Sequence, residues 1–369
     1  MKKSKDISKL LYNPNSHVQT KKALEARGLP VLSTEKTELL KYKNDEMVAL
    51  LLKYKELNKI LTTYVEPFFE NPTFPVIHAK FNQCVTTTTR LSSSEPNLQN
   101  IPAHTEIGKD IKSCFIPRQG NFFISADFSQ ADLRFMAHFS EDPILVEAFN
   151  NKIDLHTYAA NSIPALAGDR FLAKIVNFTA GNGGSGYSLM ASVLKQSNGD
   201  RSIDFEQGQA IVNGWWKRHV VLSQYRKRCV DEAKRTGGIT TFIGRWIPSP
   251  FPTEDDLNQS TEAWEKREGR KGWKPTMKGL IGAWERDTFS KKIQGSTSEL
   301  CKLAMVDCAK KGYTCLIQVH DSILVEVPQE KADVAAQEIK TILENVAKLK
   351  VPVEAQVTIE KSWGVGAKA

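Results

Sequence analysis

The distribution of apolar positions along the chain predicts both helices and strands. Residues 1–80 are mostly helical in pattern, and residues 46–64 repeat apolar side chains at the spacing of an amphipathic helix. Residues 122–125 form a short apolar run typical of a strand. Residues 316–325 read as two apolar strands around a tight polar turn, which is the pattern of a β-hairpin. The sequence shows no internal repeat and no coiled-coil heptads, so these segments are expected to build an ordinary mixed fold.

Acidic residues mark the ends of two predicted strands. The first run ends in Asp127, and Asp132 follows five residues later at the start of an amphipathic segment; the hairpin turn carries His320 and Asp321. A carboxylate at a strand end can hold Mg²⁺, which prefers one or two protein carboxylates together with substrate phosphates. Two such carboxylates would make a two-metal site for phosphoryl transfer. For Asp321 alone, an ordinary turn residue is the alternative.

A predicted helix over residues 169–178 carries two cations and an aromatic ring in line. Arg170, Lys174 and Phe178 stand at positions i, i+4 and i+8, and therefore share one helical face. Each step rises about 6 Å, which suits successive phosphates followed by a sugar or base. The alternative is a solvated basic face with a core phenylalanine.

Three further segments complete the pattern. Residues 215–235 form a second basic amphipathic stretch, and residues 264–292 mix basic residues with tryptophans ahead of another helix. Between them, the proline-rich residues 248–252 and the acidic residues 254–256 interrupt the helical pattern. We therefore expect a surface loop at 248–256.

Composition narrows the class of protein. A chain of 369 residues exceeds a usual single core, so two or three subdomains are expected. The net charge of +8 indicates a polyanionic partner. The six cysteines form no C-x-x-C pair, and no apolar run resembles a signal peptide or a membrane span. Reduced thiols, a cytoplasmic location and no membrane partner are the resulting expectations.

The segments around Asp127, Arg170 and Asp321 resemble motifs A, B and C of the family A DNA polymerases, the group of bacterial DNA polymerase I and its phage and mitochondrial relatives. Residues 86–102, TTTTRLSSSEPNLQNIP, are similar to the family signature T-x-T-G-R-L-S-S-x-x-P-N-L-Q-N-I-P. Residues 285–296 resemble the family's E-R…Q-G-T segment, which touches the template-primer. All five motifs occur in the family's order.

The resemblance implies an α+β fold shaped like a right hand, with an antiparallel palm sheet, helical fingers and a short helical thumb. The expected ranges are a partial thumb and palm entry at 1–85, palm at 86–145, fingers at 146–245, and palm with an inserted loop at 246–369. No room is expected upstream for an exonuclease. A separate polypeptide that carries the exonuclease or completes the thumb is therefore an expected partner, and a compact polymerase of this kind indicates a phage or mobile element, acting in the host cytoplasm.

The resemblance also implies roles for individual residues. Two Mg²⁺ ions would be held by Asp127 and Asp321, and Lys174 would also donate a proton to the leaving pyrophosphate. The residues implied to bind the incoming dNTP are Arg170, Lys174, Phe178, His156, Asp132 and Gln130. Those implied to contact primer-template DNA are Arg90, Asn97, Gln99, Arg286, Gln294 and His320. A helix-side polar residue is the alternative for His156, and a plain surface cation for Arg90.

Four positions depart from the family pattern. Asp132 stands where the family usually has the Glu that blocks a ribose 2′-hydroxyl, and Asn182 stands where it has Tyr. Ser322 replaces the Glu that follows the catalytic Asp, and Thr89 replaces the signature Gly. The glycine-rich run at 181–186 also predicts that the motif B helix ends or bends early, because each glycine costs a helix about 1 kcal/mol.

The predicted function is template-directed DNA synthesis: addition of dNTPs to a primer 3′ end by two-metal nucleotidyl transfer, without proofreading in this chain. One alternative is another nucleotidyl transferase, a single-subunit RNA polymerase or a reverse transcriptase, which nucleotide preference would distinguish. The other is a catalytically impaired subunit, derived from a polymerase, that binds primer-template. Primer extension with Mg²⁺ would distinguish this last possibility.

Overall fold

The computed structural model describes residues 12–70, 75–102, 105–266 and 274–366. Contacts between Cα atoms divide the chain into two compact units. The first takes its described residues from Met1–Asn71, Ala159–Trp215 and Pro252–Leu280, and the second from Pro72–Tyr158, Trp216–Phe251 and Ile281–Ala369. These boundaries differ from the expected thumb, palm and fingers ranges, which stay a prediction.

The described part of the first unit is helical. Its N-terminal segment folds as predicted: α3 (Glu46–Ile60) begins at Asp45, whose carboxylate accepts the N–H groups of Met47 and Val48. A π-helical turn, η3 (Leu61–Val65), continues it. The apolar side chains Leu24, Val31, Leu39, Val48 and Leu51 form the local core. The other elements here are α1 (His17–Ala26), α2 (Lys36–Leu39), η2 (Leu40–Tyr42) and α4 (Glu66–Phe69).

The motif B helix of the first unit is α9 (Arg170–Gly181). The Asp169 carboxylate accepts the Leu172 N–H at its start, and Asn182 ends it, followed by Gly183 at a φ of +80°. The predicted early end of this helix is therefore confirmed. The neighbouring elements are η5 (Pro164–Leu166), α10 (Gly186–Gln196) and α13 (Glu254–Glu265). Two further helices, α8 (Leu155–Ser162) and α11 (Phe205–Arg218), span both units.

The prediction of a loop at residues 248–256 is wrong for the acidic residues 254–256. Glu254, Asp255 and Asp256 form the first turn of α13. The Thr253 side chain accepts the Asp256 N–H, and the Asp256 carboxylate in turn accepts the Thr253 N–H at 2.8 Å. This reciprocal capping box, together with the favourable interaction of acidic groups with a helix N-terminus, converts the expected loop into a helix start.

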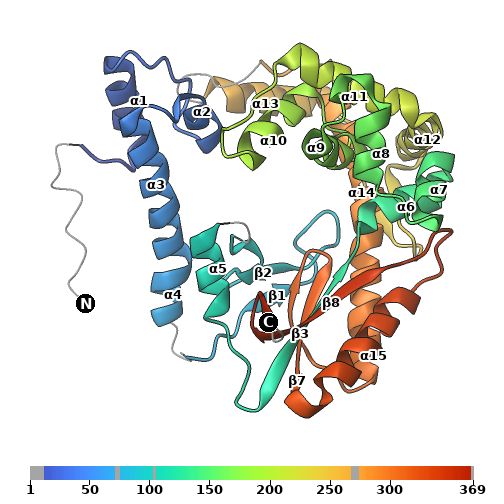
Figure 1. The fold of residues 1–369 in the computed structure, drawn as a ribbon. Helices are drawn as coiled ribbons and strands as arrows, with labels where there is room; N and C mark the ends of the chain where they lie inside the picture. The colour runs from blue at the N-terminus through green and yellow to red at the C-terminus, as the bar shows by residue number, and fades with distance from the viewer. Residues whose placement is uncertain (1–11, 71–74, 103–104, 267–273, 367–369) are drawn as a thin grey trace. The chain divides into compact units, whose positions relative to one another are not determined.

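The second unit contains an antiparallel five-stranded sheet in the order β6-β7-β3-β8-β9 (Figure 1). The strands are β3 (Asn121–Phe128), β6 (Cys315–Val319), β7 (Ser322–Pro328), β8 (Ala355–Ser362) and β9 (Val365–Gly366). This confirms the predicted strand and hairpin. The helix α15 (Ala332–Asn345) packs against β3, β7 and β8. In these strands, Ile124, Ala126 and Val325 are fully buried.

Helices and two small hairpins complete the second unit. The longest helix, α14 (Met277–Lys310), enters it from the first unit. The remaining elements are β1 (Lys80–Asn82), β2 (Ser92–Ser94), η4 (Leu98–Asn100), α5 (Glu106–Ser113), α6 (Ala131–Ser140), α7 (Pro143–Asn150), α12 (Val220–Thr236), β4 (Gly238–Thr240), β5 (Trp246–Pro248) and η6 (Gln329–Lys331). The α+β prediction is thus confirmed. Within the described ranges, no helix is long and apolar enough to cross a membrane.

Candidate active site

Strand pairing in the second unit brings the two predicted metal-binding carboxylates together. Asp127 is the penultimate residue of β3 and pairs with Ser322, the first residue of β7. Asp321 precedes Ser322 in the β6–β7 turn, and its carbonyl accepts the Phe128 N–H at 3.2 Å. The pairing of β3 with β7 therefore places both carboxylates at the same end of these two adjacent strands.

The electrostatics of the pair reflect this proximity. Burial among surrounding protein atoms and the negative charge of Asp321 raise the pKa of Asp127 to about 6, although part of its side chain reaches solvent. Burial and the charge of Asp132 likewise raise the pKa of Asp321, while Arg90 and His320 partly offset this rise. A bound cation would stabilise both carboxylates in the ionised form, because it offsets the burial and the nearby negative charge that raise the two pKa values.

The donor set fits Mg²⁺. Among the described residues, no group of three or more His, Cys, Asp or Glu side chains could hold a metal ion. Mg²⁺ needs no such group, because it is commonly bound by one or two carboxylates and completed by waters and substrate phosphates. Close by, Gln130 caps α6 in a left-handed conformation, and its Oε1 is buried without a hydrogen-bond partner in the described structure. An unsatisfied buried acceptor of this kind is expected where a ligand binds.

The third acidic residue, Asp132, is held by contacts that only the tertiary structure creates. Its Oδ1 accepts a hydrogen bond from the Thr297 hydroxyl at 2.6 Å, and its Oδ2 lies 3.8 Å from an Arg90 guanidinium nitrogen. Arg90 also donates to the Gln294 side chain at 3.3 Å. Asp132, Arg90 and Gln294, from three separate motifs, thus meet at one face of α14.

The signature segment is tied to the β6 strand that leads to Asp321. The Gln99 side chain donates to the backbone carbonyl and the side-chain oxygen of Gln318, at 3.0 and 3.1 Å. The buried Gln318 side chain donates to the His320 carbonyl, and His320 adopts a positive φ of 55°. Asn97 accepts the Gln99 N–H at 3.0 Å and so shapes the same turn. These bonds orient the turn that carries Asp321.

The position where the family signature has glycine requires a left-handed backbone. Thr89 has a φ of +59°, and its carbonyl accepts hydrogen bonds from Ser298, at 2.9 Å, and from the Lys302 ammonium. Its hydroxyl is buried with no partner among the described residues. A β-branched residue is unfavourable at positive φ, so the anchoring by α14 holds Thr89 in a strained conformation.

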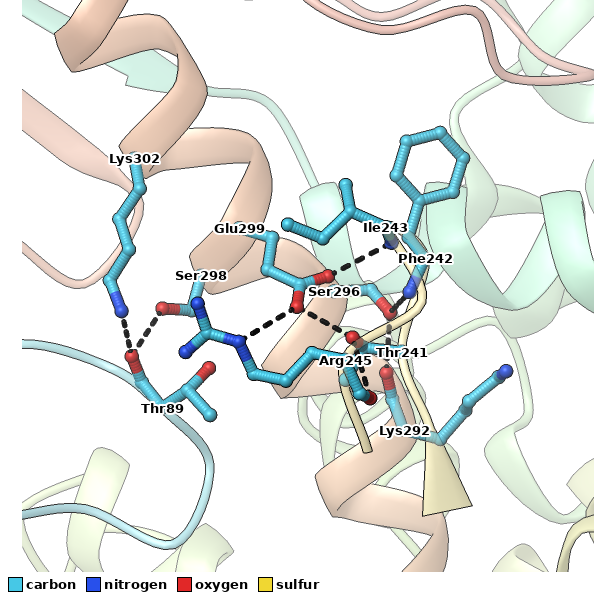
Figure 2. Close-up of polar contacts among 10 residues, drawn as sticks. All are labelled: Thr89, Thr241, Phe242, Ile243, Arg245, Lys292, Ser296, Ser298, Glu299 and Lys302. Atoms are coloured by element: carbon cyan, nitrogen blue, oxygen red, sulfur yellow. Dashed lines mark hydrogen bonds and ion pairs between the residues drawn. The ribbon is translucent and has the colours of Figure 1, made fainter. Parts of the chain in front are cut away.

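The next turns of α14 anchor the hairpin formed by β4 and β5 (Figure 2). Glu299 is almost fully buried; its carboxylate accepts the Thr241 hydroxyl at 2.5 Å and the Ile243 N–H at 3.2 Å, and lies 3.6 Å from Arg245 Nε. The Ser296 hydroxyl accepts the Phe242 N–H at 3.0 Å. The segment 294–302 of α14 therefore connects three parts of the second unit: the signature loop, the start of α6 and the hairpin tip.

The predicted phosphate-binding face lies on α9 in the first unit. Arg170, Lys174 and Phe178 are exposed, whereas the intervening side chains at 172, 173, 175, 176 and 177 are buried. The buried Asn177 accepts a hydrogen bond from Trp215 at 2.8 Å, which fixes the inner face of the helix. The three residues thus share an exposed face, as predicted.

The other predicted site residues differ in how far they are exposed to solvent. His156 is 6 % exposed, on α8, so a contact with phosphate stays a prediction for it. Arg286 and Gln294 are partly exposed on α14. Sequence reasoning missed Thr297, Ser298, Lys302 and Gln318. The polar residues at 294, 298 and 302 recur at helical spacing, which was the one available signal for a polar face on this helix.

Comparisons with known proteins define the family. The model of DNA polymerase family A matches residues 1–365. The chain therefore belongs to DNA polymerase family A. It is 33 % identical over 378 residues to the thermostable DNA polymerase I of Thermus aquaticus, with 95 % of this chain and 42 % of that protein covered. It is 32 % identical to DNA polymerase I of Bacillus subtilis, with 95 % and 39 % covered.

A solved structure resembles the fold. It is the POL domain of Pol1 from M. smegmatis in complex with DNA primer-template and dNTP; the TM-score is 0.79 and the identity 27 %, with 96 % of this chain and 62 % of that chain covered. The chain spans about two fifths of the length of the curated relatives it matches.

Proposed function

We propose that this chain is a DNA-directed DNA polymerase that adds dNTPs to a primer 3′ end. The observation that carries this proposal is the Asp127–Asp321 pair, which lies at one end of the adjacent strands β3 and β7. The chain that carries this pair belongs to DNA polymerase family A. Membership of that family does not favour the alternative of a catalytically impaired binding subunit. An RNA polymerase or a reverse transcriptase is not favoured either.

Asp127 and Asp321 would hold two Mg²⁺ ions. When bound, the ions supply activation of the primer 3′-hydroxyl and neutralisation of charge on the triphosphate. The two carboxylates would stay ionised with the ions bound, because a neighbouring cation opposes the rise in pKa that burial and nearby negative charge cause. Gln130, with its unsatisfied oxygen beside this site, would help to orient the incoming nucleotide.

The cations of α9 would bind the triphosphate. Arg170 and Lys174 are exposed on one face and would hold its outer phosphates, and Lys174 would deliver a proton to the departing pyrophosphate. Phe178, next along that face, would pack on the sugar or base. His156 would assist at the phosphates. Such transfers depend almost entirely on positioning and electrostatic stabilisation.

The second unit would hold primer-template DNA. Its contacts would come from Arg90, Gln294 and Arg286, and from the turn residues Asn97, Gln99 and His320. Arg90 retains a buried Nε without a partner in the described structure, although its other nitrogens are engaged. We further propose that these 369 residues perform no proofreading.

Primer extension with Mg²⁺ tests the proposal. Wild-type protein should extend a labelled primer on a DNA template with dNTPs, and Asp127→Ala should bind the same DNA without extending it. The protein should leave a mismatched primer 3′ end intact. Absence of extension with binding retained would favour the binding-subunit alternative. Extension only with NTPs, or only on an RNA template, would favour another class of polymerase.

A further inference from the structure

The outward face of α12, in the second unit, concentrates positive charge. Leu222, Cys229, Val230 and Ala233 are buried, and the opposite face is exposed. The exposed positions of that face span about a third of the helix circumference. They are Val220, Gln224, Lys227, Arg228, Asp231, Lys234 and Arg235. We call the cations of this face, Lys227, Arg228, Lys234 and Arg235, the α12 basic face.

These cations are not neutralised by neighbouring carboxylates. Asp231 lies centrally on the same face, one turn from each of them. Within the described structure, none of the four comes within 4.0 Å of any carboxylate oxygen, Asp231 included. Elsewhere in the same unit, Arg134 is paired with Glu354 at 2.7 Å. The α12 basic face thus keeps a net positive charge available to a polyanion.

Aromatic rings support and accompany the charges. The Lys234 ammonium lies 5.5 Å from the centroid of the Phe251 ring, and Arg228 lies 5.4 Å from that of Tyr225. Cation–π contacts of this kind restrict long basic side chains. Phe251 keeps 41 % of its surface exposed, so a ring beside Lys234 stays open to an incoming group.

We propose that the α12 basic face binds single-stranded nucleic acid, and specifically the unpaired template strand ahead of the primer end. A single strand presents both phosphates and unpaired bases, and proteins bind it by combining basic side chains with exposed aromatic rings. Lys227 and Lys234 are separated by about 10 Å along the helix axis, which allows contact with neighbouring phosphates. A duplex keeps its bases stacked inside and would offer no unpaired base to stack on Phe251.

The location of the face supports the template strand as its ligand. On its inner side, α12 packs on α6, where Tyr225 stacks on Phe139 with centroids 6.0 Å apart. The helix α6 starts with Asp132, directly after the strand that ends near Asp127. The α12 basic face therefore belongs to the same unit as the carboxylate pair and lies on the side of α12 opposite its buried residues. The assignment of the strand as template rests on the proposed function; the binding of single-stranded nucleic acid does not.

The experiment measures DNA affinity as a function of salt. The double variant Lys227→Gln/Lys234→Gln is compared with wild type and with Lys331→Gln/Lys348→Gln, which removes two exposed lysines of the same unit. Fluorescence anisotropy in Mg²⁺-free buffer gives the affinity for a primer-template with a long single-stranded template overhang, for the blunt duplex and for the free single strand. Thermal melting verifies that each variant is folded.

The α12 variant should lower the slope of log affinity against log salt by about 1.4 for overhang and free single strand, since each lost phosphate contact contributes about 0.7. Blunt-duplex binding and the control variant should be unchanged. Phe251→Leu, which keeps an apolar side chain against Trp284, should weaken overhang binding severalfold with little change in slope. An equal loss on blunt duplex, or no loss on any single strand, would overturn the proposal. Because binding is read without catalysis, a failure of primer extension by wild type would count against the proposed function alone.

Discussion

The carboxylate site of the second unit and the cationic face of α9 in the first unit are built in opposite ways. Arg90 joins Gln294 by a hydrogen bond and Asp132 by an ion pair, although these residues are far apart in sequence. On α9, Arg170, Lys174 and Phe178 stand exposed along one helix, and their alignment follows from helical periodicity alone.

The difference shows where function and stability are coupled. Acidic side chains that lie close together repel one another, so the second unit must hold them with a dense set of compensating contacts. Exposed cations cost little to place, and their removal should change function without changing stability. Substitutions in the two regions should therefore separate by their effects on folding.

The largest effect is expected at the carboxylate pair. Asp127→Asn should reduce primer extension by about 10³-fold or more, because electrostatic stabilisation at the reacting centre is lost. In Mg²⁺-free buffer, the free energy of unfolding of the same variant should be about 1 kcal/mol higher than that of wild type, as measured by denaturant unfolding. A pKa raised from 3.8 to about 6 corresponds to about 3 kcal/mol of unfavourable charge, which solvent exposure of Asp127 reduces.

The raised pKa of Asp127 fixes how the stability of the fold changes with pH. The folded state binds the Asp127 proton more tightly than the unfolded state, so this group stabilises the fold at low pH. That stability is lost as pH rises from about 4 to about 6. Asp127→Asn should flatten this part of the profile, measured by urea denaturation without divalent metal. An unchanged profile, or near wild-type extension by the variant, would contradict the assignment of Asp127.

A smaller loss, with no stability effect, is expected on α9. Lys174→Met should lower kcat/KM for dNTP by about 10²-fold, because the phosphate contact and the proton donor are removed. Its free energy of unfolding should stay within about 0.5 kcal/mol of wild type, since the side chain is exposed. Lys195→Met, an exposed lysine on α10 in the same unit, is the control and should extend primers normally. Equal kinetics for the two variants would count against α9.

Sugar selection should respond to the contacts of Asp132. The shorter carboxylate leaves more space than the family's Glu, and Thr297 fixes its position. Thr297→Val and Asp132→Ala should each lower the preference for dNTP over NTP by about tenfold, whereas Asp132→Glu should raise it. The ratio of kcat/KM for the two nucleotides measures this. Unchanged ratios in all three variants would place the discrimination elsewhere.

The smallest effect concerns the strained signature loop. Thr89→Gly should stabilise the protein by about 0.5–1 kcal/mol, because glycine adopts a φ of +59° without strain and the unpartnered hydroxyl disappears. The gain is limited by the greater freedom of glycine in the unfolded chain. Thr87→Gly, at a neighbouring position without positive φ, should instead destabilise. Urea denaturation of both variants makes the comparison, and a loss of stability in Thr89→Gly would show that the strain is absent.

Local pattern predicted the elements that carry the site. Three patterns depend only on neighbours within about ten residues: the apolar run before Asp127, the hairpin around Asp321, and the spacing of the exposed residues on α9. Those elements were confirmed. The start of α13 was missed, because the Thr253–Asp256 capping box outweighed the proline and acidic signals for a loop.

Contacts between residues far apart in sequence could not be predicted from local patterns. Buried Asp142 accepts hydrogen bonds from His219 at 3.2 Å and from the Leu222 N–H at 3.3 Å, joining the starts of α7 and α12. Neither residue stands out in the sequence, because the contact exists only once both helices are packed. Thr297 and Asp132 are likewise brought together by the packing of α14 on α6.

The sequence by itself determined the family, the elements and the residue types of the site, because motif spacing and side-chain periodicity act over short stretches of chain. The tertiary structure alone decided which distant side chains meet at the site. Asp132 is held because Thr297 and Arg90 reach it from distant segments, whereas Lys174 stays exposed because only its own helix positions it. Hydrogen bonds between distant residues form only when the fold brings their atoms within about 3 Å, and no local pattern encodes that distance.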